Sequence, residues 1–234
     1  MGLKYYYDMG SQPSRAVYMF MKLNNIPFEE KAIPIMTGEH RTPEFRKINP
    51  FTKVPVLDDD GFVLTESVAI LRYLSTKYNV PEHWFPRNDI KKKARLDEYL
   101  NWQHMATREQ SAMLFQNLFL IPQRKGVPVD WKKVELQRKR VKSIVKYMDT
   151  YFLKDKPFLC GDEISVADLL GACELKQLDS VEEEGMYTDN PKVTAWINRV
   201  RDTVGPMFDE CHESIMQVKD IYKMFQQSSK ESKL

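Results

Sequence analysis

The stretch from residue 5 to residue 17 constrains the fold of this 234-residue chain more than any other. It reads Tyr-Tyr-Tyr-Asp-Met-Gly-Ser-Gln-Pro-Ser-Arg-Ala-Val. Strand-forming aromatic residues come first, then a turn segment, then apolar residues at helical spacing, so the stretch predicts a strand, a tight turn and a helix. Pro13 suits the first helical turn, where its missing N–H costs nothing. Ser11 lies just before that helix, where a hydroxyl either caps the helix or stabilises an anion at the positive end of its dipole.

Composition excludes several classes of function. The chain has 35 basic and 33 acidic residues and a net charge of +2, which gives no electrostatic reason to expect nucleic acid or a membrane as partner. No apolar run approaches the roughly 18 residues that span a bilayer, and the first residues lack the apolar core of a signal peptide. The three cysteines are widely spaced and match no metal-site or disulfide pattern. We therefore expect a cytoplasmic protein with no metal site.

Hydrophobic periodicity predicts two domains of different class. The first third alternates between strand and helix periods in the order β-α-β-α-β-β-α, which is an α/β domain. The predicted strands are residues 3–7, 28–33, 54–57 and 62–64, and the predicted helices are residues 14–24, 42–49 and 68–78. Residues 80–88 contain two prolines and predict a linker. The first domain would then cover residues 1–79 and the second residues 89–234.

The second domain shows only helical patterns. The predicted helices are residues 90–120, 131–152, 165–178, 191–203 and 207–225. Breaks are expected at residues 122–128 and 181–190, and the polar tail of residues 226–234 is expected to fray. Ser165 and Asp168 form a capping box at the start of one helix, so we assign Asp168 a structural role.

Several motifs, in this order and at this spacing, resemble the cytosolic glutathione S-transferases, and most closely the theta class. They are Ser11-Gln-Pro-Ser-Arg-Ala-Val, Asn49-Pro50 with Lys53-Val-Pro-Val, Leu64-Thr-Glu-Ser-Val-Ala-Ile-Leu-Arg-Tyr-Leu, Asp97-Glu-Tyr-Leu with Trp102-Gln-His, and Ile164-Ser-Val-Ala-Asp-Leu. The resemblance covers nearly the whole chain. It implies a thioredoxin-like N-terminal domain, an all-α C-terminal domain and a homodimer. The implied activity is conjugation of the thiolate of reduced glutathione to electrophilic, mostly apolar substrates, a detoxification reaction.

The resemblance assigns the catalytic role to Ser11. Its hydroxyl would donate a hydrogen bond to the glutathione sulfur, and donation to the charged form lowers the pKa of a thiol. Tyr7 is the competitor, because other classes of the family use a tyrosine at the end of the first strand for the same hydrogen bond. We prefer Ser11, because the Ser-Gln-Pro-Ser-Arg pattern is that of the serine-using members.

The resemblance also implies residues that bind glutathione. Glu66 offers a negative charge to the ammonium group, and Ser67 offers a hydroxyl and an N–H at a helix start to the γ-glutamyl carboxylate. Val54 precedes a proline that is cis in this family, and its backbone would pair with the cysteinyl peptide. His40 and Lys53 would bind the glycyl carboxylate. Each of these residues has an ordinary structural explanation when it is considered alone.

Gln12 and Arg108 complete the predicted site. Gln12 follows Ser11, and Arg108 is at the position that matches a site arginine beyond the Trp-Gln-His motif. The wall of the electrophile pocket is expected to include some of Trp102, Met105, Met113, Phe115 and Phe119. Glutathione is a co-substrate in this interpretation, so no cofactor is predicted.

Other interpretations remain open from the sequence. The chain could be a non-catalytic glutathione-transferase-like module for binding or assembly, or a carrier of apolar ligands. Arg15 either positions the Ser11 turn or is an ordinary surface residue. The C-terminus departs from the theta pattern, because theta enzymes often carry a longer ending that folds over the site. Any such lid would have to come from residues 222–225.

Overall fold

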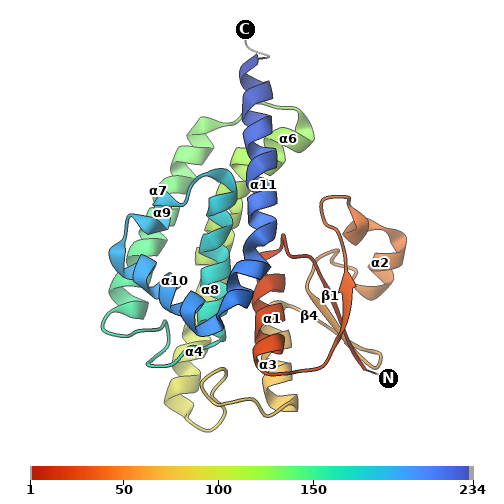
Figure 1. Cartoon of the computed structure of the whole chain (residues 1–234), viewed down its shortest axis with the longest axis vertical. Coiled ribbons are helices and arrows are strands. Elements are labelled where there is room, and N and C mark those ends of the chain that lie inside the picture. Colours follow the sequence, from red (N-terminus) through yellow and green to blue (C-terminus); the bar gives the residue numbers. More distant parts are fainter. Residues whose placement is uncertain (1, 232–234) are drawn as a thin grey trace.

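The N-terminal third of the chain forms a four-stranded mixed sheet (Figure 1). A computed structural model describes residues 2–231. The strands are β1 (Leu3–Tyr7), β2 (Glu29–Ala32), β3 (Val56–Asp59) and β4 (Phe62–Thr65), in the spatial order β2-β1-β3-β4. β1 pairs parallel with β2 and antiparallel with β3, and β3 pairs antiparallel with β4. The predicted third strand begins two residues too early, since Pro55 has no N–H for the ladder and β3 starts just after it.

Helices cover both faces of this sheet. They are α1 (Gln12–Leu23), the 3₁₀ turn η1 (Glu39–Arg41), α2 (Pro43–Ile48) and α3 (Ser67–Lys77). Alternation along β1 sends Tyr5 into the core shared with α1 and α3, whereas Tyr6 packs on the opposite face against Phe45 of α2. The predicted order β-α-β-α-β-β-α is confirmed.

The rest of the chain is helical, which confirms the predicted fold class. Its α-helices are α4 (Ile90–Gln103), α5 (Glu109–Phe115), α6 (Ile121–Lys125), α7 (Trp131–Tyr147), α8 (Val166–Lys176), α9 (Gly185–Thr188), α10 (Pro191–Val204) and α11 (Pro206–Glu231). Its π-helical turns are η2 (His104–Arg108), η3 (Gln116–Leu120) and η4 (Met148–Leu153), and η5 (Gln177–Val181) is a 3₁₀ turn. None of the helices in residues 2–231 is long and apolar enough to cross a membrane.

Three predicted boundaries in the helical part of the chain are wrong. The helix expected to break at Pro122 continues to Lys125, because Pro122 occupies the first turn of α6, and the turn ends at Gly126 in the left-handed conformation. The expected break at residues 181–190 contains the short helix α9. Residues 226–231 belong to α11 rather than to a frayed tail, and residues 232–234 lie outside the described residues.

The connection between α3 and α4 packs against the core. Residues 78–89 contain no helix or strand, as predicted for a linker, yet Val80, Trp84 and Phe85 are buried. The ring of Trp84 meets the ring of Phe20 on α1 edge to face, with 5.8 Å between centroids. The division into domains of residues 1–79 and 89–234 stays a prediction, since one hydrophobic cluster runs across both parts.

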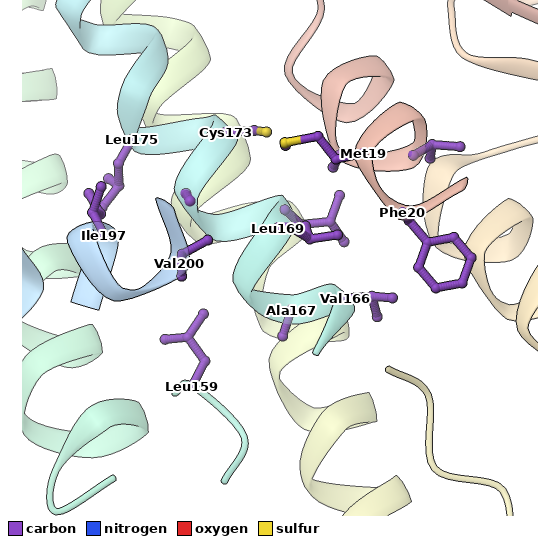
Figure 2. Packing of buried hydrophobic residues seen from close by; sticks show 14 of the residues in the cluster. Met19, Phe20, Leu159, Val166, Ala167, Leu169, Cys173, Leu175, Ile197 and Val200 are labelled. Carbon is purple, nitrogen blue, oxygen red and sulfur yellow. The ribbon is translucent and has the colours of Figure 1, made fainter. Parts of the chain in front are cut away.

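α8 lies at the centre of that cluster (Figure 2). Every residue from Val166 to Leu175 is buried. Figure 2 shows Leu169 and Val166 on the side of Met19 and Phe20 of α1, with Val200 of α10 on another side. α8 has glycine at position 171 because a Cβ there would approach the hydroxyl oxygen of Tyr99 within 2.5 Å. The helix therefore joins the sheet-bearing part of the molecule to the helical part.

The capping box at the start of α8 is confirmed and extends beyond the helix. The buried Asp168 carboxylate accepts hydrogen bonds from the backbone N–H and hydroxyl of Ser165, at 2.8 and 2.9 Å. It also accepts bonds from the Leu159 N–H at 2.8 Å and the Trp196 indole N–H at 2.9 Å. Asp168 thus connects the loop before α8 to α10.

We predict that Asp168→Ala lowers the free energy of unfolding by about 2–4 kcal/mol, because it leaves several buried donors without an acceptor. For a chain of this size the melting temperature should fall by roughly 5–15 °C, which differential scanning fluorimetry would measure. Asp162→Ala, at an exposed position in the preceding loop, is the control and should leave the melting temperature unchanged. Equal melting temperatures for the two variants would contradict the structural role of Asp168.

Candidate active site

Two connected hollows form one cleft between the sheet-bearing part and the helical segment from η2 to α6. The larger has a volume of about 470 Å³ and the smaller about 190 Å³. They share four lining residues, which are Lys53, Val54, His104 and Arg108. Every predicted site residue lines this cleft: Ser11, Gln12 and His40 line the larger hollow, Glu66 and Ser67 the smaller, and Lys53, Val54 and Arg108 both. Residues far apart in the sequence are thus brought together.

Ser11 is the N-cap residue of α1, yet its hydroxyl makes no capping hydrogen bond. Its backbone is extended, with φ −92° and ψ 120°, and its carbonyl accepts the first helical bond, from Arg15 N–H at 3.1 Å. The residue is 8% exposed and lines the larger hollow. Its side chain is therefore available to a ligand at the positive end of a 12-residue helix.

The turn that carries Ser11 is held from several directions. The Asp8 carboxylate accepts the backbone N–H of Gly10 at 2.6 Å and that of Ile35 at 2.7 Å. The Met9 carbonyl accepts the hydroxyl of Ser214 on α11 at 2.8 Å. These bonds join the turn to the β2–α2 loop and to the last helix, so the position of the Ser11 hydroxyl depends on the whole fold.

Arg15 is fully buried, which excludes the surface alternative. Its guanidinium donates to the Met9 carbonyl at 2.6 Å. It also donates to the Cys173 carbonyl on α8 at 3.2 Å and to the Gln177 side-chain oxygen on η5 at 2.9 Å. Arg15 therefore ties the turn before α1 to α8. This is the positioning role that the sequence left as one of two options.

His40, in the 3₁₀ turn η1, lines the larger hollow, and Lys53 lines both hollows. The His40 Nε2 accepts a hydrogen bond from Arg41 at 3.2 Å, so the proton of the neutral ring is on Nδ1. That Nδ1 is buried and has no partner within the described chain. Burial, followed by the charges of Arg41 and Arg124, lowers the pKa of His40, so the ring is a neutral donor at neutral pH. Lys53 is exposed, and its carbonyl accepts the Asn49 side-chain amide at 2.7 Å.

Glu66 has an unusual backbone. Its φ of 68° and ψ of 113° lie outside the regions that residues other than glycine ordinarily adopt, which costs of order 1–3 kcal/mol. The residue follows β4 and is the N-cap of α3, and its side chain makes no capping hydrogen bond. Ser67 is buried at the first position of α3. A carboxylate and a helix N-terminus thus adjoin in the smaller hollow, which suits a ligand end that carries both an ammonium and a carboxylate.

Val54 lies against α2 in a small hydrophobic cluster with Ile33, Phe45 and Val56. The Val54–Pro55 peptide bond is cis, as the resemblance implies. The side chain is therefore a core residue, which is the structural alternative, while the residue still lines both hollows. The two roles are compatible because one uses the side chain and the other the backbone.

A π-helical turn brings His104 and Arg108 to the junction of the two hollows. π-helical turns contain an extra residue, and they are frequent at functional sites. Burial, then the nearby Arg108 charge, lowers the pKa of His104. Nη1 of Arg108 lies 3.6 Å from the Glu174 carboxylate on α8.

The outer wall of the larger hollow is mostly apolar. Of the aromatic and Met stripe, Met113 and Phe115 line it, together with Ile35, Ala112 and Leu120. Phe119 is buried behind the wall, where its ring meets those of Tyr222 and Phe225, with centroids 5.7 and 6.0 Å apart. Residues 222–225 therefore support the wall and are not among its lining residues.

Tyr7 is not among the lining residues of either hollow. Its hydroxyl donates to the Glu30 carboxylate at 2.6 Å, and its ring stacks on Tyr5, with 5.2 Å between centroids. Burial, then that hydrogen bond, raises the pKa of the Tyr7 hydroxyl. A hydroxyl held in this way is a poor donor to a sulfur in the cleft.

Sequence reasoning missed several residues of the site. Asp8, Ser214 and Glu174 act through contacts between distant segments, and no local signal identifies them. Asn49 bonds the nearby Lys53 carbonyl, and its Asn49-Pro50 motif is the signal that could have found it. Arg124 could have been suspected only from its place after Leu120, at helical spacing from the predicted wall. Within residues 2–231, no cluster of three or more His, Cys, Asp or Glu side chains could hold a metal ion.

Comparisons with known proteins find matches to both parts of the chain. The family model "Glutathione S-transferase, N-terminal domain" matches residues 11–77, and "Glutathione S-transferase, C-terminal domain" matches residues 112–202. Glutathione S-transferase theta-1 of Bos taurus is 41% identical over 94% of this chain and 91% of its own length, and theta-3 of Mus musculus is 40% identical over 99% and 95%. A human theta-class transferase in complex with the glutathione conjugate of 1-menaphthyl sulfate superposes with a TM-score of 0.89, at 37% identity, over 98% of this chain and 92% of that one.

We predict that Arg15→Lys lowers the free energy of unfolding by about 2–4 kcal/mol. Lysine cannot replace the planar guanidinium that donates to three acceptors at once, and an unpaired charge would stay buried. Urea denaturation followed by fluorescence would measure the change. Arg140→Lys, at an exposed position on α7, is the control. A midpoint for Arg15→Lys that equals the control would show that the buried guanidinium does not hold the turn.

Proposed function

The chain belongs to the glutathione S-transferase family, with theta-class enzymes as its relatives, and we propose that it conjugates the thiolate of reduced glutathione to electrophilic, mostly apolar substrates. The free Ser11 hydroxyl at the N-terminus of α1, at the wall of a cleft that also contains cationic and acidic groups, carries this proposal. Glutathione is a co-substrate in this reaction, and the proposal requires no cofactor.

Ser11 would donate its hydroxyl hydrogen to the glutathione sulfur. A fall of one to two pH units from the usual thiol pKa of about 8.5 makes the thiolate dominant at neutral pH. That fall corresponds to roughly 1.4–2.7 kcal/mol of preferential stabilisation. One hydrogen bond to a charged sulfur supplies about 1.5–3 kcal/mol, and the helix terminus adds about 0.3–1 kcal/mol. The hydrogen bond and the helix terminus together are therefore sufficient to lower the thiol pKa by one to two pH units.

The polar groups of the cleft match the order of groups along glutathione. Glu66 and Ser67 in the smaller hollow would bind the ammonium and carboxylate of the γ-glutamyl end. The backbone of Val54 would pair with the cysteinyl peptide, and Gln12 borders the sulfur position beside Ser11. Lys53 and the Nδ1–H of His40 would bind the glycyl carboxylate. The strained backbone of Glu66 supports a binding role for that residue.

The electrophile would occupy the apolar part of the larger hollow, against Met113, Phe115 and Leu120. The sulfur attacks an electrophilic carbon, and the leaving group departs with the bonding electron pair. The thiol proton goes to solvent before this step. Arg108, at the junction of the hollows, adds positive charge beside the reacting atoms. A human relative is known in complex with the glutathione conjugate of 1-menaphthyl sulfate, which supports an aromatic substrate for this chain.

The homodimer remains a prediction that rests on the resemblance, and the cytoplasmic location remains one that rests on composition. The alternative of a non-catalytic binding module also remains, and the thiol pKa of bound glutathione distinguishes it from the enzyme. A module of that kind can keep the fold and bind glutathione without lowering the thiol pKa.

We predict that the wild-type protein lowers the thiol pKa of bound glutathione by one to two pH units and that Ser11→Ala restores this pKa toward about 8.5. Thiolate absorbance in the ultraviolet, recorded against pH, would measure both values. The same substitution should reduce kcat/KM at pH 7 by about 10- to 30-fold, since most of the bound thiol would then be protonated.

Tyr7→Phe is the matched control and should leave the thiol pKa unchanged, because the Tyr7 hydroxyl is bonded to Glu30. A pKa restored only by Tyr7→Phe would overturn the serine mechanism. An unshifted thiol in the wild-type protein would favour the non-catalytic module instead.

We predict that Lys53→Ala weakens glutathione binding by about 10- to 100-fold, because it removes a charge-assisted hydrogen bond of about 1.5–3 kcal/mol. Isothermal titration calorimetry would give the dissociation constants. Lys47→Ala, on the exposed face of α2, is the control for the loss of one positive charge nearby. Equal dissociation constants for both variants would remove Lys53 from the proposed site.

A further inference from the structure

The carboxylate of Glu174 lies in the protein interior behind the cleft. Glu174 is on α8, and its side chain is 1% exposed. Neither of its carboxylate oxygens has a hydrogen-bond partner within the described chain. A buried carboxylate without partners is costly, so such a group calls for an explanation.

Its charged neighbour toward the cleft is Arg108. Nη1 of Arg108 lies 3.6 Å from the Glu174 oxygen, within ion-pair distance but too far for a good hydrogen bond. That Nη1 is itself buried and has no hydrogen-bond partner within residues 2–231. Arg108 lines both hollows of the cleft, at their junction. The ion pair therefore connects the core of α8 to the reacting end of the proposed site.

We propose that Glu174 is a positioning residue that holds the Arg108 guanidinium at the junction of the two hollows, and that protonation of Glu174 releases it. This inference rests on the proposed function. Removing the negative charge leaves the guanidinium with no anionic partner on the core side, so it is free to leave the geometry in which it meets the ligand.

The groups around Glu174 determine when its charge is lost. Arg108 on η2 and Arg15 on α1 both stabilise the carboxylate, while Tyr99 on α4 and the adjacent Cys173 are neutral at physiological pH. Burial outweighs both cations and raises the pKa of Glu174 from 4.5 to about 7. The carboxylate thus holds Arg108 above pH 7, and the contact is lost as the pH falls through that value.

Glu174→Gln tests the inference, because it removes the charge and keeps the volume. We would measure kcat/KM for conjugation of reduced glutathione with a benzylic halide from pH 5.5 to 8.5. Glutamine mimics the protonated acid, so the ratio of wild type to variant should be close to one below about pH 6. It should rise to roughly fivefold or more above about pH 8. The part of the thiol pKa shift that comes from Ser11 cancels in this ratio, since both proteins retain Ser11.

Two further variants separate positioning from a general structural effect. Glu183→Gln is the matched control, since Glu183 is also buried and pairs with an arginine, but this arginine, Arg138, lines neither hollow. The ratio of kcat/KM of the wild type to that of Glu183→Gln should not change with pH. In an Arg108→Gln background, Glu174→Gln should change kcat/KM less than twofold, because its effect passes through Arg108. A ratio independent of pH, or an undiminished effect in the Arg108→Gln background, would overturn the inference.

A second readout needs no catalytic activity. The pKa of Glu174 is higher in the folded than in the unfolded chain, so the folded state binds more protons between pH 4.5 and about 7. The melting temperature of the wild type relative to Glu174→Gln should therefore fall as the pH rises through this range.

The two proposals can fail separately. If the wild type binds glutathione without conjugation, the proposed function fails, and the same ratios taken from glutathione dissociation constants test the positioning role. A melting-temperature difference that stays constant with pH would overturn the role of Glu174 whether or not the protein is active.

Discussion

The geometry of the site depends most on the hydrogen bonds of the buried Arg15 guanidinium. It comes from α1, the helix whose N-terminus carries Ser11, and it bonds both the turn before that helix and the main chain of α8. A fully buried charge is costly unless its donors are bonded. Here two carbonyl oxygens and one amide oxygen accept from Nη1 and Nη2 of Arg15, while Nε has no partner within residues 2–231. The position of one hydroxyl is thereby fixed relative to the centre of the helical part.

α8 connects this support to the opposite side of the cleft. Arg15 reaches it from α1, and Arg108 reaches the Glu174 carboxylate from the π-helical turn η2. The helix is buried on all sides and has glycine where Tyr99 approaches most closely, so its position is set by packing (Figure 2). The two walls of the cleft are therefore placed by one helix that does not line it.

The distribution of polar groups in the cleft follows from its two sources. The loops and helix starts of the sheet-bearing part supply Ser11, His40, Lys53, Glu66 and Ser67, where free N–H groups and charges are available. The helical segment from η2 to α6 supplies an apolar wall, with Arg108 at its inner edge. A polar peptide ligand and an apolar electrophile would thus meet at the boundary between the two parts.

The sequence alone determined the order of strands and helices, the capping box at Ser165 and the family motifs, because these depend on periodicity and on neighbouring residues. It could not decide whether Ser11 caps its helix, whether Arg15 is buried, or whether the helical segment continues past Pro122. Tertiary structure decided these points. Orientation of a hydroxyl, burial of a charge and the Arg108–Glu174 pair depend on contacts between segments far apart in the chain, and local sequence does not encode such contacts.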